Sequence, residues 1–204
     1  MGSTLKIICF RKLLITCILA FPLITHGNLD TLGKNKYLPH FVKLQYAGGI
    51  GFISPGIGYT FFNEKLDITG FYGYVPKHFT KQSLHSISIQ STVKPFQYSY
   101  RNATIYPFNV GFFLHHTFGS DYWVKLPSHY PDKYYWWSPG RMGGLFLGGE
   151  VKTKRLASKA LSSGTAFYFR VGSRGLYIVS LFGNTTALDV TDILELGFGI
   201  TFYR

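Results

Sequence analysis

The sequence predicts an all-β protein: a single antiparallel, up-and-down transmembrane β-barrel of about eight strands, with apolar side chains outward and polar side chains inward. Three observations predict this fold. The chain ends in a stretch of strict apolar–polar alternation, its first 27 residues are typical of a secretory signal, and the rest shows short alternating segments separated by turn residues, without a convincing helix.

The final stretch, ELGFGITFYR, alternates large apolar residues with small or polar ones. Successive side chains of a strand point to opposite faces, so Leu196, Phe198 and Ile200 share one face while Gly197 and Thr201 share the other. A soluble sheet would carry Lys and Glu on its water-facing side. A small, weakly charged face instead indicates the crowded interior of a barrel whose outside touches lipid.

The same pattern recurs along the chain. In residues 84–94, for example, Ile87 and Ile89 oppose Ser88 and Gln90. We expect strands at 40–53, 57–62, 66–75, 84–94, 104–118, 143–152, 165–182 and 193–203. The segment 165–182 is either one strand bulged near Gly172–Gly175 or two strands joined there.

Turn residues separate these segments. Ser54-Pro55-Gly56 and Asn63-Glu64-Lys65 predict the first two turns. Loops 76–83 and 119–142 are longer, as extracellular loops of such barrels are when the N-terminus is periplasmic. The last strand is expected to pair with the first, because a closed barrel leaves no unpaired strand edge in the hydrocarbon.

Residues 1–27 predict a cleaved secretory signal. Lys6, Arg11 and Lys12 precede an apolar run from Leu13 to Ile24, and cleavage is expected after Gly27. The run is too short for a spanning helix, which needs roughly 20 residues. A lipoprotein site at Cys17 is disfavoured, because Thr16 is an unsuitable residue directly before such a cysteine. We therefore expect a barrel domain at 28–204 in the bacterial outer membrane.

Charge and cysteine content narrow the function classes. The chain has 21 Lys and Arg against 9 Asp and Glu, and without the three signal cations 18 remain. Because the chain has no basic run, this balance favours the phosphates of outer-membrane lipid and lipopolysaccharide as partners over nucleic acid.

Both cysteines lie in the signal, so the mature chain would have no disulfide and no catalytic thiol. No cofactor is predicted.

The C-terminal strand also carries a recognisable pattern. Glu195, Gly197, Ile200 and Phe202 follow the order polar, glycine, apolar, aromatic. This order resembles the terminal insertion signal of outer-membrane barrels, although Tyr203-Arg204 follow where many members end on the aromatic residue. The resemblance implies the barrel-insertion machinery as a partner.

Candidate site residues are few. Glu150, Arg170 and Glu195 are expected in the interior as a structural polar cluster, because eight strands leave no wide channel. One loop holds aromatic residues that are either surface-ligand contacts or part of an interfacial girdle: Trp123, Tyr134, Tyr135, Trp136 and Trp137. No histidine has a metal-ligand spacing, and His115 and His116 should point to opposite faces, so no metal site is predicted.

The central segments HSISIQSTV and IYPFNVGFFL resemble the small PagL-like lipid A deacylases (the acyloxyacyl hydrolase group), which are eight-stranded barrels. The resemblance implies a serine and a histidine in a His-x-Ser-Asn motif before the last strand. The matching stretch here is Leu181-Phe182-Gly183-Asn184, which lacks both. The segment GYVPK and the closing strand also look like uncharacterised outer-membrane proteins, a likeness that concerns the fold alone.

The sequence therefore favours a non-catalytic outer-membrane barrel with a structural or surface-interaction role and an unknown surface ligand. One alternative is a lipid A-modifying hydrolase with a non-standard site. Another is a soluble, lipocalin-like binder of apolar ligands, in which Ile87, Ile89, Phe198 and Ile200 would point inward.

Overall fold

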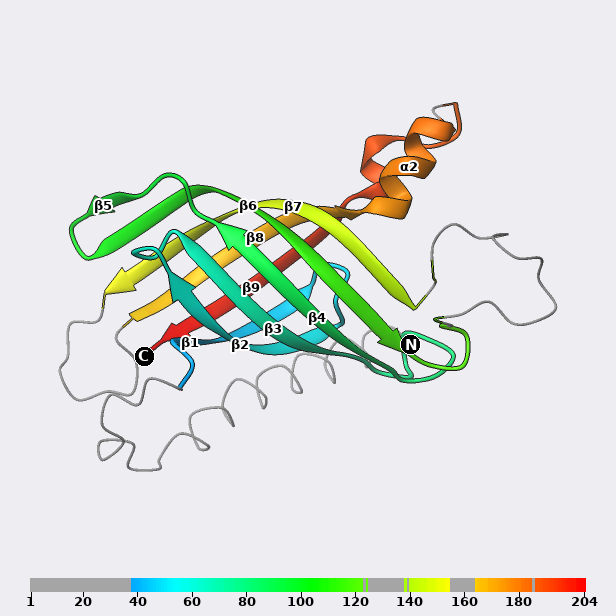
Figure 1. The fold of residues 1–204 in the computed structure, drawn as a ribbon, viewed down its shortest axis with the longest axis horizontal. Coiled ribbons are helices and arrows are strands. Elements are labelled where there is room, and N and C mark those ends of the chain that lie inside the picture. The colour runs from blue at the N-terminus through cyan, green and yellow to red at the C-terminus, as the bar shows by residue number, and fades with distance from the viewer. Residues whose placement is uncertain (1–37, 123, 125–137, 139, 155–163, 185) are drawn as a thin grey trace, which may run out of the picture. The chain divides into compact units, whose positions relative to one another are not determined.

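The computed structural model describes residues 38–122, 124, 138, 140–154, 164–184 and 186–204. Its fold is the predicted one at the coarse level: an all-β, closed, eight-stranded antiparallel barrel (Figure 1). The predicted signal at 1–27 and the start of the predicted barrel domain lie outside the described residues. None of the helices in the described part of the chain has the length and apolar character needed to cross a bilayer.

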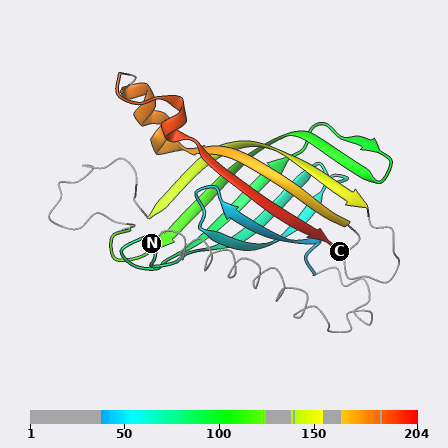
Figure 2. The same ribbon diagram turned by 180° about the vertical axis from the view of Figure 1, so that it is seen from behind.

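Eight strands form the ring, in the order β1-β2-β3-β4-β6-β7-β8-β9, and a ninth, β5, pairs only with β6. Their bounds are β1 Phe41–Ala47, β2 Ile53–Phe61, β3 Leu66–Val75, β4 Leu84–Val93, β5 Tyr98–Tyr100, β6 Ala103–Phe118, β7 Arg141–Lys154, β8 Gly164–Arg174 and β9 Glu195–Tyr203. Figure 2 shows the same strands from behind, with β1 beside β9.

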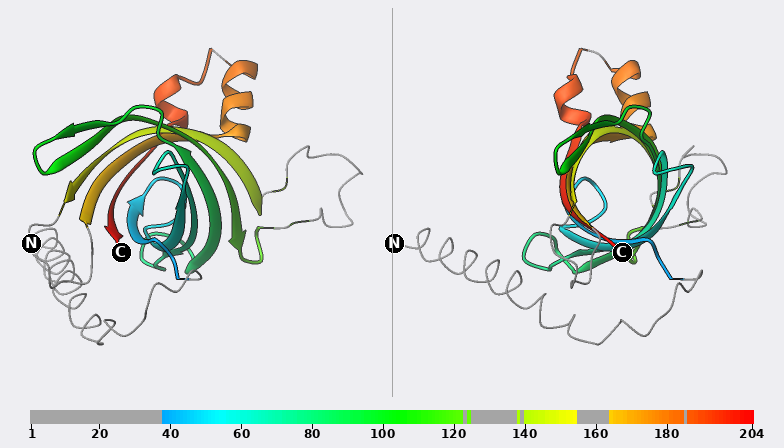
Figure 3. Two further views of the ribbon diagram at one scale, coloured as in Figure 1. Left: turned by 60° about the vertical axis from the view of Figure 1, so that its left-hand side comes forward. Right: turned by 90° about the vertical axis from the view of Figure 1, so that its left-hand side faces the viewer.

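The barrel closes where the sequence predicted. The first strand, β1, pairs antiparallel with the last, β9, from Phe41 opposite Tyr203 to Ala47 opposite Gly197. Seen along its axis, the barrel is a ring (Figure 3, right). Every ring strand thus has a partner on both sides, and no sheet edge stays open along its wall.

The first turn was predicted in the wrong place. Residues 40–53 were expected as one strand with a turn at Ser54-Pro55-Gly56, but β1 ends at Ala47 and those three residues lie inside β2. The turn forms at Gly48 and Gly49, whose φ angles of 75° and 74° are the left-handed conformation that glycine adopts without steric cost. Pro55 lies opposite Leu44 of β1, whereas the ladder between β2 and β3 has no pair at Ser54 and Pro55, so no backbone donor is needed from Pro55 on that side.

The segment 165–182 was also predicted wrongly beyond Arg174. It continues as a helix, α2 (Gly175–Gly183), followed by a short 3-10 helix, η3 (Val190–Ile193). The neighbouring strand explains the change. Because β9 begins at Glu195, opposite Gly172, a strand continuing past Arg174 would have no partner on the β9 side. A helix satisfies its backbone groups internally instead.

The remaining ring strands follow the expected bounds closely, and β3 matches its predicted range, whereas the short strand β5 was not predicted. In β6 the register shifts between Tyr106 and Asn109, where a bulge changes which residues face inward. Tyr106 and Asn109 are both buried, whereas Pro107 and Phe108 between them are exposed.

Burial alternates along the strands. In β9, Thr201 is fully buried while Phe198 is 51% exposed, and β3, β4 and β6 repeat the pattern. The buried positions carry many polar side chains, and the exposed ones include most of the large apolar residues. The small apolar core, Phe41, Ala166 and Tyr203, lies at the barrel end where the chain terminates.

The two ends of the barrel carry different elements. The C-terminal rim carries His40, the turn at Phe62–Lys65 and Arg204, and the helix rim carries the turn at Gly48–Phe52 and α2. The two rims lie at opposite ends of the strands, since β1 runs from one to the other.

Candidate functional site

The interior of the barrel is lined mainly by buried polar side chains. They come from alternate positions of every ring strand, which is why the period-two pattern of the sequence places them together. The charged members among the described residues are Lys43, Asp67, Lys94, Glu150 and Arg170.

Four of these charges form one network. The Nζ atom of Lys94 lies 2.9 Å from Oδ2 of Asp67 and 3.2 Å from Oε1 of Glu150, and Lys43 reaches the same Asp67 oxygen at 3.5 Å. Two lysines and two carboxylates make the network neutral. A buried charge is stable only when paired, so this neutrality is what lets the side chains stay out of water.

Hydroxyl groups complete the network. Tyr203 donates its hydroxyl proton to Oε1 of Glu150 at 2.7 Å, and its oxygen lies 3.2 Å from Nζ of Lys94. Thr60 donates to the second oxygen of Asp67 at 3.0 Å. Both carboxylates thus have several donors, an arrangement that suits a fixed structural role.

The C-terminal rim is covered by a tight turn. Phe62, Asn63 and Glu64 all have positive φ angles, between 53° and 67°, a conformation uncommon for residues other than glycine. This turn directs Glu64 back toward the barrel end, where Lys152 and the Tyr106 hydroxyl each bind one of its carboxylate oxygens at 2.6 Å.

The environment of Glu64 favours its ionised form. Partial burial alone would raise the pKa of this carboxyl, but the hydrogen bonds from Lys152 and Tyr106, together with the charge of Lys152, outweigh burial and hold the pKa below its ordinary value. Glu64 is therefore a fixed anion that ties the turn to β6 and β7.

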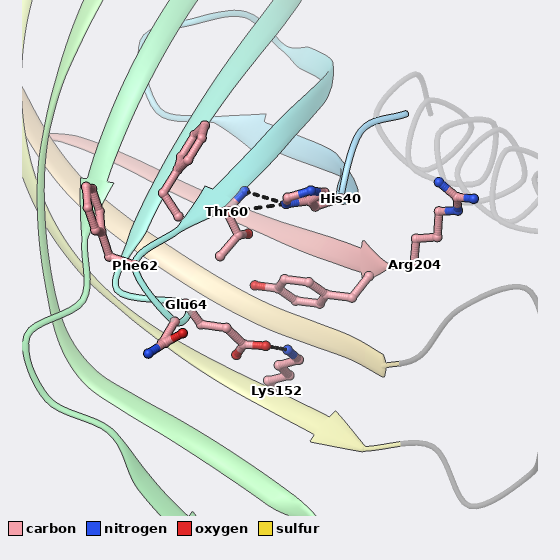
Figure 4. A pocket seen from close by; sticks show the side chains of 9 residues that line it. His40, Thr60, Phe62, Glu64, Lys152 and Arg204 are labelled. Carbon is pink, nitrogen blue, oxygen red and sulfur yellow. Dashed lines mark hydrogen bonds and ion pairs between the residues drawn. The ribbon is translucent and has the colours of Figure 1, made fainter. Parts of the chain in front are cut away.

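A pocket of about 310 Å³ opens beside this turn (Figure 4). His40, Thr60, Glu64, Lys152 and Arg204 contribute to its wall, and Figure 4 shows the Glu64–Lys152 ion pair at its edge. The backbone N–H of Thr60 donates to Nδ1 of His40 at 3.0 Å. Glu64 and Lys152 are paired with each other in the wall of this pocket.

The turn after β1 fills part of the barrel at the helix rim. The turn after β1 folds inward, so Ile50 is buried and its carbonyl accepts a hydrogen bond from Ser86 at 2.5 Å. Figure 3 (right) shows this turn inside the ring. Arg174 donates to the carbonyl of Gly49 and pairs with Glu195, both at 2.8 Å. Both ends of the barrel are therefore occupied by its own chain.

Arg170 is the exception among the interior charges. It is 1% exposed and its guanidinium lies 4.4 Å and 4.8 Å from the ring centroids of Phe146 and Phe113. Its three nitrogens have no hydrogen-bond partner among the described residues. The faces of these two rings make favourable contacts with the cation.

The three residues predicted as a lumenal cluster form no ion pair with one another among the described residues. Glu150 binds Lys94 and Tyr203, Glu195 binds Arg174, and Arg170 makes no ion pair among the described residues. Sequence reasoning missed the larger network. Its signal was present, since Lys43 and Lys94 occupy the same-face positions as Gln45 and Thr92 in alternating segments.

The other predicted sites are less informative. Trp123, Tyr134, Tyr135, Trp136 and Trp137 lie outside the described residues. In the described part of the chain, no three His, Cys, Asp or Glu side chains gather as metal ligands.

The adjacent histidines of β6 diverge, as their alternation predicted. His115 is buried and contacts Thr117 within its own strand, while His116 contacts the carbonyl of Gly140.

The stretch at the expected position of the hydrolase motif, residues 181–184, does not lie on a strand. Leu181, Phe182 and Gly183 end α2, and Asn184 caps it. The nearest histidine–serine spacing, Ser83-x-His85, is at the start of β4, where His85 is exposed and bonds to the hydroxyl of Tyr72. Comparisons with protein-family models, curated proteins and solved structures found no match to the chain.

Proposed function

We propose that this chain is a small bacterial outer-membrane β-barrel, exported by a cleaved signal, that catalyses no reaction and serves a structural or surface-interaction role. In this proposal the barrel spans the bilayer with its apolar face outward and its polar face inward. Outer-membrane lipid and lipopolysaccharide are its surroundings, and the insertion pattern at Glu195, Gly197, Ile200 and Phe202 brings it to the barrel-insertion machinery.

The observation that carries the proposal is the distribution of burial. Apolar side chains around the barrel wall are exposed, including Ile89, Leu145 and Phe167, while the charged network of Lys43, Lys94 and their carboxylates is buried. A wall of this kind would be costly in water, because large contiguous apolar patches are uncommon on soluble monomers. In lipid it is the favourable arrangement.

Exposed tyrosines add support. Tyr46, Tyr72 and Tyr74 lie toward the helix rim, and Tyr98 and Tyr100 belong to β5 beyond the opposite end of the wall. In membrane barrels, aromatic residues gather at both boundaries between hydrocarbon and water. The placement of these two groups at opposite ends of the wall is consistent with such a pair of girdles.

The interior argues for a structural role. A conducting pore needs an open path, but both ends are occupied by turns, and the charges between them are bound to each other. The lipocalin-like alternative is disfavoured because Ile87, Ile89 and Phe198, which it places inside, are about half exposed.

No observation favours the lipid A-modifying hydrolase. The stretch that would hold its serine and histidine lies on α2 and contains neither residue. Mass spectrometry of lipid A from cells with and without the protein tests this point. We expect the same acylation pattern in both, and a lost or gained acyl chain would contradict the non-catalytic role.

Fractionation combined with gel electrophoresis tests the membrane proposal. We expect the protein in the outer-membrane fraction, and we expect an unboiled sample to migrate differently from a boiled one, because a closed barrel resists detergent until heated. Recovery in the soluble periplasmic fraction, or identical migration of the two samples, would contradict the proposal.

A further inference from the structure

The helix α2, Gly175–Gly183, has an unusual surface. Its sequence, GLYIVSLFG, contains no charged residue, and none of its residues is buried. Leu176, Val179 and Phe182 recur every three positions, so they form a stripe along one side, and Phe182 is 79% exposed. A helix with apolar residues on most of its surface is ordinarily covered by protein or by lipid.

The helix leaves the barrel sideways. Viewed along the barrel, α2 stands outward from the ring wall instead of covering its opening (Figure 3, right). The membrane plane lies across the axis of a spanning barrel. Figure 1 shows α2 inclined to that axis, leading away from the wall and beyond the strand ends, so the helix leaves the barrel at a slant beside the expected membrane surface.

Contacts at the start of α2 fix its position along the barrel axis. Arg174, which immediately precedes the helix, is held by Glu195 and by the carbonyl of Gly49, and its guanidinium lies 5.6 Å from the ring of Tyr177. The helix therefore begins at the helix rim, at a height set by the barrel itself.

The apolar surface of the helix continues into that of the barrel. The last residues of β8 before α2 pair with neighbours that carry exposed leucines: Ser173 lies opposite Leu145, and Val171 lies opposite Leu196. The helix itself contacts β7 and β8. One lipid boundary can thus cover both surfaces.

We propose that α2 is an interfacial helix, whose apolar side binds the lipid surface where acyl chains meet headgroups, beside the helix rim. This inference rests on the proposed membrane function. Lipid is favoured over a protein partner because the stripe adjoins the exposed apolar wall and offers no charged group to specify a partner.

Spin labelling in phospholipid vesicles tests the proposal. A full chain carrying Cys9→Ser and Cys17→Ser receives one cysteine at a time: Val179→Cys on α2, Leu147→Cys on the exposed wall, or Lys81→Cys in the loop after β3. Each is labelled with a nitroxide, and its collisions with oxygen, which concentrates in lipid, are compared with those with a water-soluble nickel complex. We expect Val179 and Leu147 to favour oxygen and Lys81 to favour nickel.

The other outcomes separate the two proposals. Oxygen preference at Leu147 with nickel preference at Val179 overturns the interfacial helix and leaves the membrane barrel standing. Nickel preference at both positions overturns the membrane barrel as well. Protection of Val179 from both reagents, lost when the protein is diluted in the vesicles, would show a second copy of the chain on the helix and also overturns the inference.

Discussion

Single residues inside the barrel show how a polar interior stays stable. Lys94 lies between Asp67 and Glu150, so each carboxylate keeps a cation and the cation keeps two anions. Pairing of this kind does not by itself add much stability relative to an apolar core, but removing one member leaves an uncompensated buried charge. Removing any one of these residues should therefore destabilise the folded barrel.

Replacing Glu150 tests this dependence. Glu150→Gln removes the anion that binds both Lys94 and Tyr203, and we expect the free energy of unfolding to fall by about 3–5 kcal/mol. Urea titration of the folded band in detergent measures it. The double variant Glu150→Leu with Lys94→Met removes both charges and should recover part of the loss. A single-variant loss below about 1 kcal/mol would contradict a closed, dry network.

Glu64 gives a prediction about pH. Because its pKa is lowered in the folded protein, its ion pair with Lys152 stabilises the fold at neutral pH, and this contribution is lost as the pH falls through the lowered pKa. We expect Glu64→Gln to be less stable than the parent at pH 7, and the difference between them to shrink in acid. Urea midpoints measured across that range check it; a difference that stays constant with pH would contradict the assignment.

At the scale of elements, the sequence predicted the strands that show apolar–polar alternation. Strand β3 follows from side-chain periodicity, which local sequence records directly. The pairing of β1 with β9 follows from the need of a barrel to leave no unpaired edge. The first turn and α2 were missed for different reasons. Gly48-Gly49 competes with the equally plausible Ser54-Pro55-Gly56, and α2 forms because its neighbour strand starts late, a long-range fact that local apolar residues do not reveal.

The candidate site was less predictable than the fold. Alternation indicated that Glu150 and Arg170 face inward, but not which charges would meet, because partners such as Lys94 and Glu150 are 56 residues apart in sequence. Their contact depends on the stagger of strands around the ring. Glu64 was read only as a turn residue, although the backbone of that turn is what brings its carboxylate to Lys152.

The inward turn after β1 is a testable element. Gly49 has a φ of 74°, and a Cβ added there would lie 1.8 Å from an oxygen of Glu195. We expect Gly49→Ala to displace the turn and lower the free energy of unfolding by about 1–3 kcal/mol. Gly70→Ala is the matched control, because a Cβ at that position meets nothing within 4 Å. Equal stability of the two variants would contradict the packed turn.

At the scale of the whole molecule, the turns at both rims and the charge network between them leave a filled interior. Eight-stranded barrels have room only for side chains or one small ligand. Here the side chains meet one another across the interior, as in the bond between the Tyr168 hydroxyl and Gln45. The account thus describes a rigid wall with a filled centre, whose outer surface and loops carry any interaction.

Conductance tests that description. The purified protein, inserted into a planar lipid bilayer, is expected to give no stable open-channel steps, because Glu64 holds the turn over one end and the Gly48–Phe52 turn enters the other. Electrical recording at both voltage polarities checks this. Long-lived openings of porin size would contradict a filled interior.

The claim that exposed apolar side chains touch acyl chains is tested most directly by a scan along β9. Single cysteines at Leu196, Gly197, Phe198, Gly199 and Ile200, in a chain without Cys9 and Cys17, are labelled with a small fluorophore in vesicles containing brominated lipid. The account predicts quenching with a period of two residues, strong at Leu196 and Phe198 and weak at Gly197 and Gly199. Uniformly weak quenching, or the opposite alternation, would contradict it.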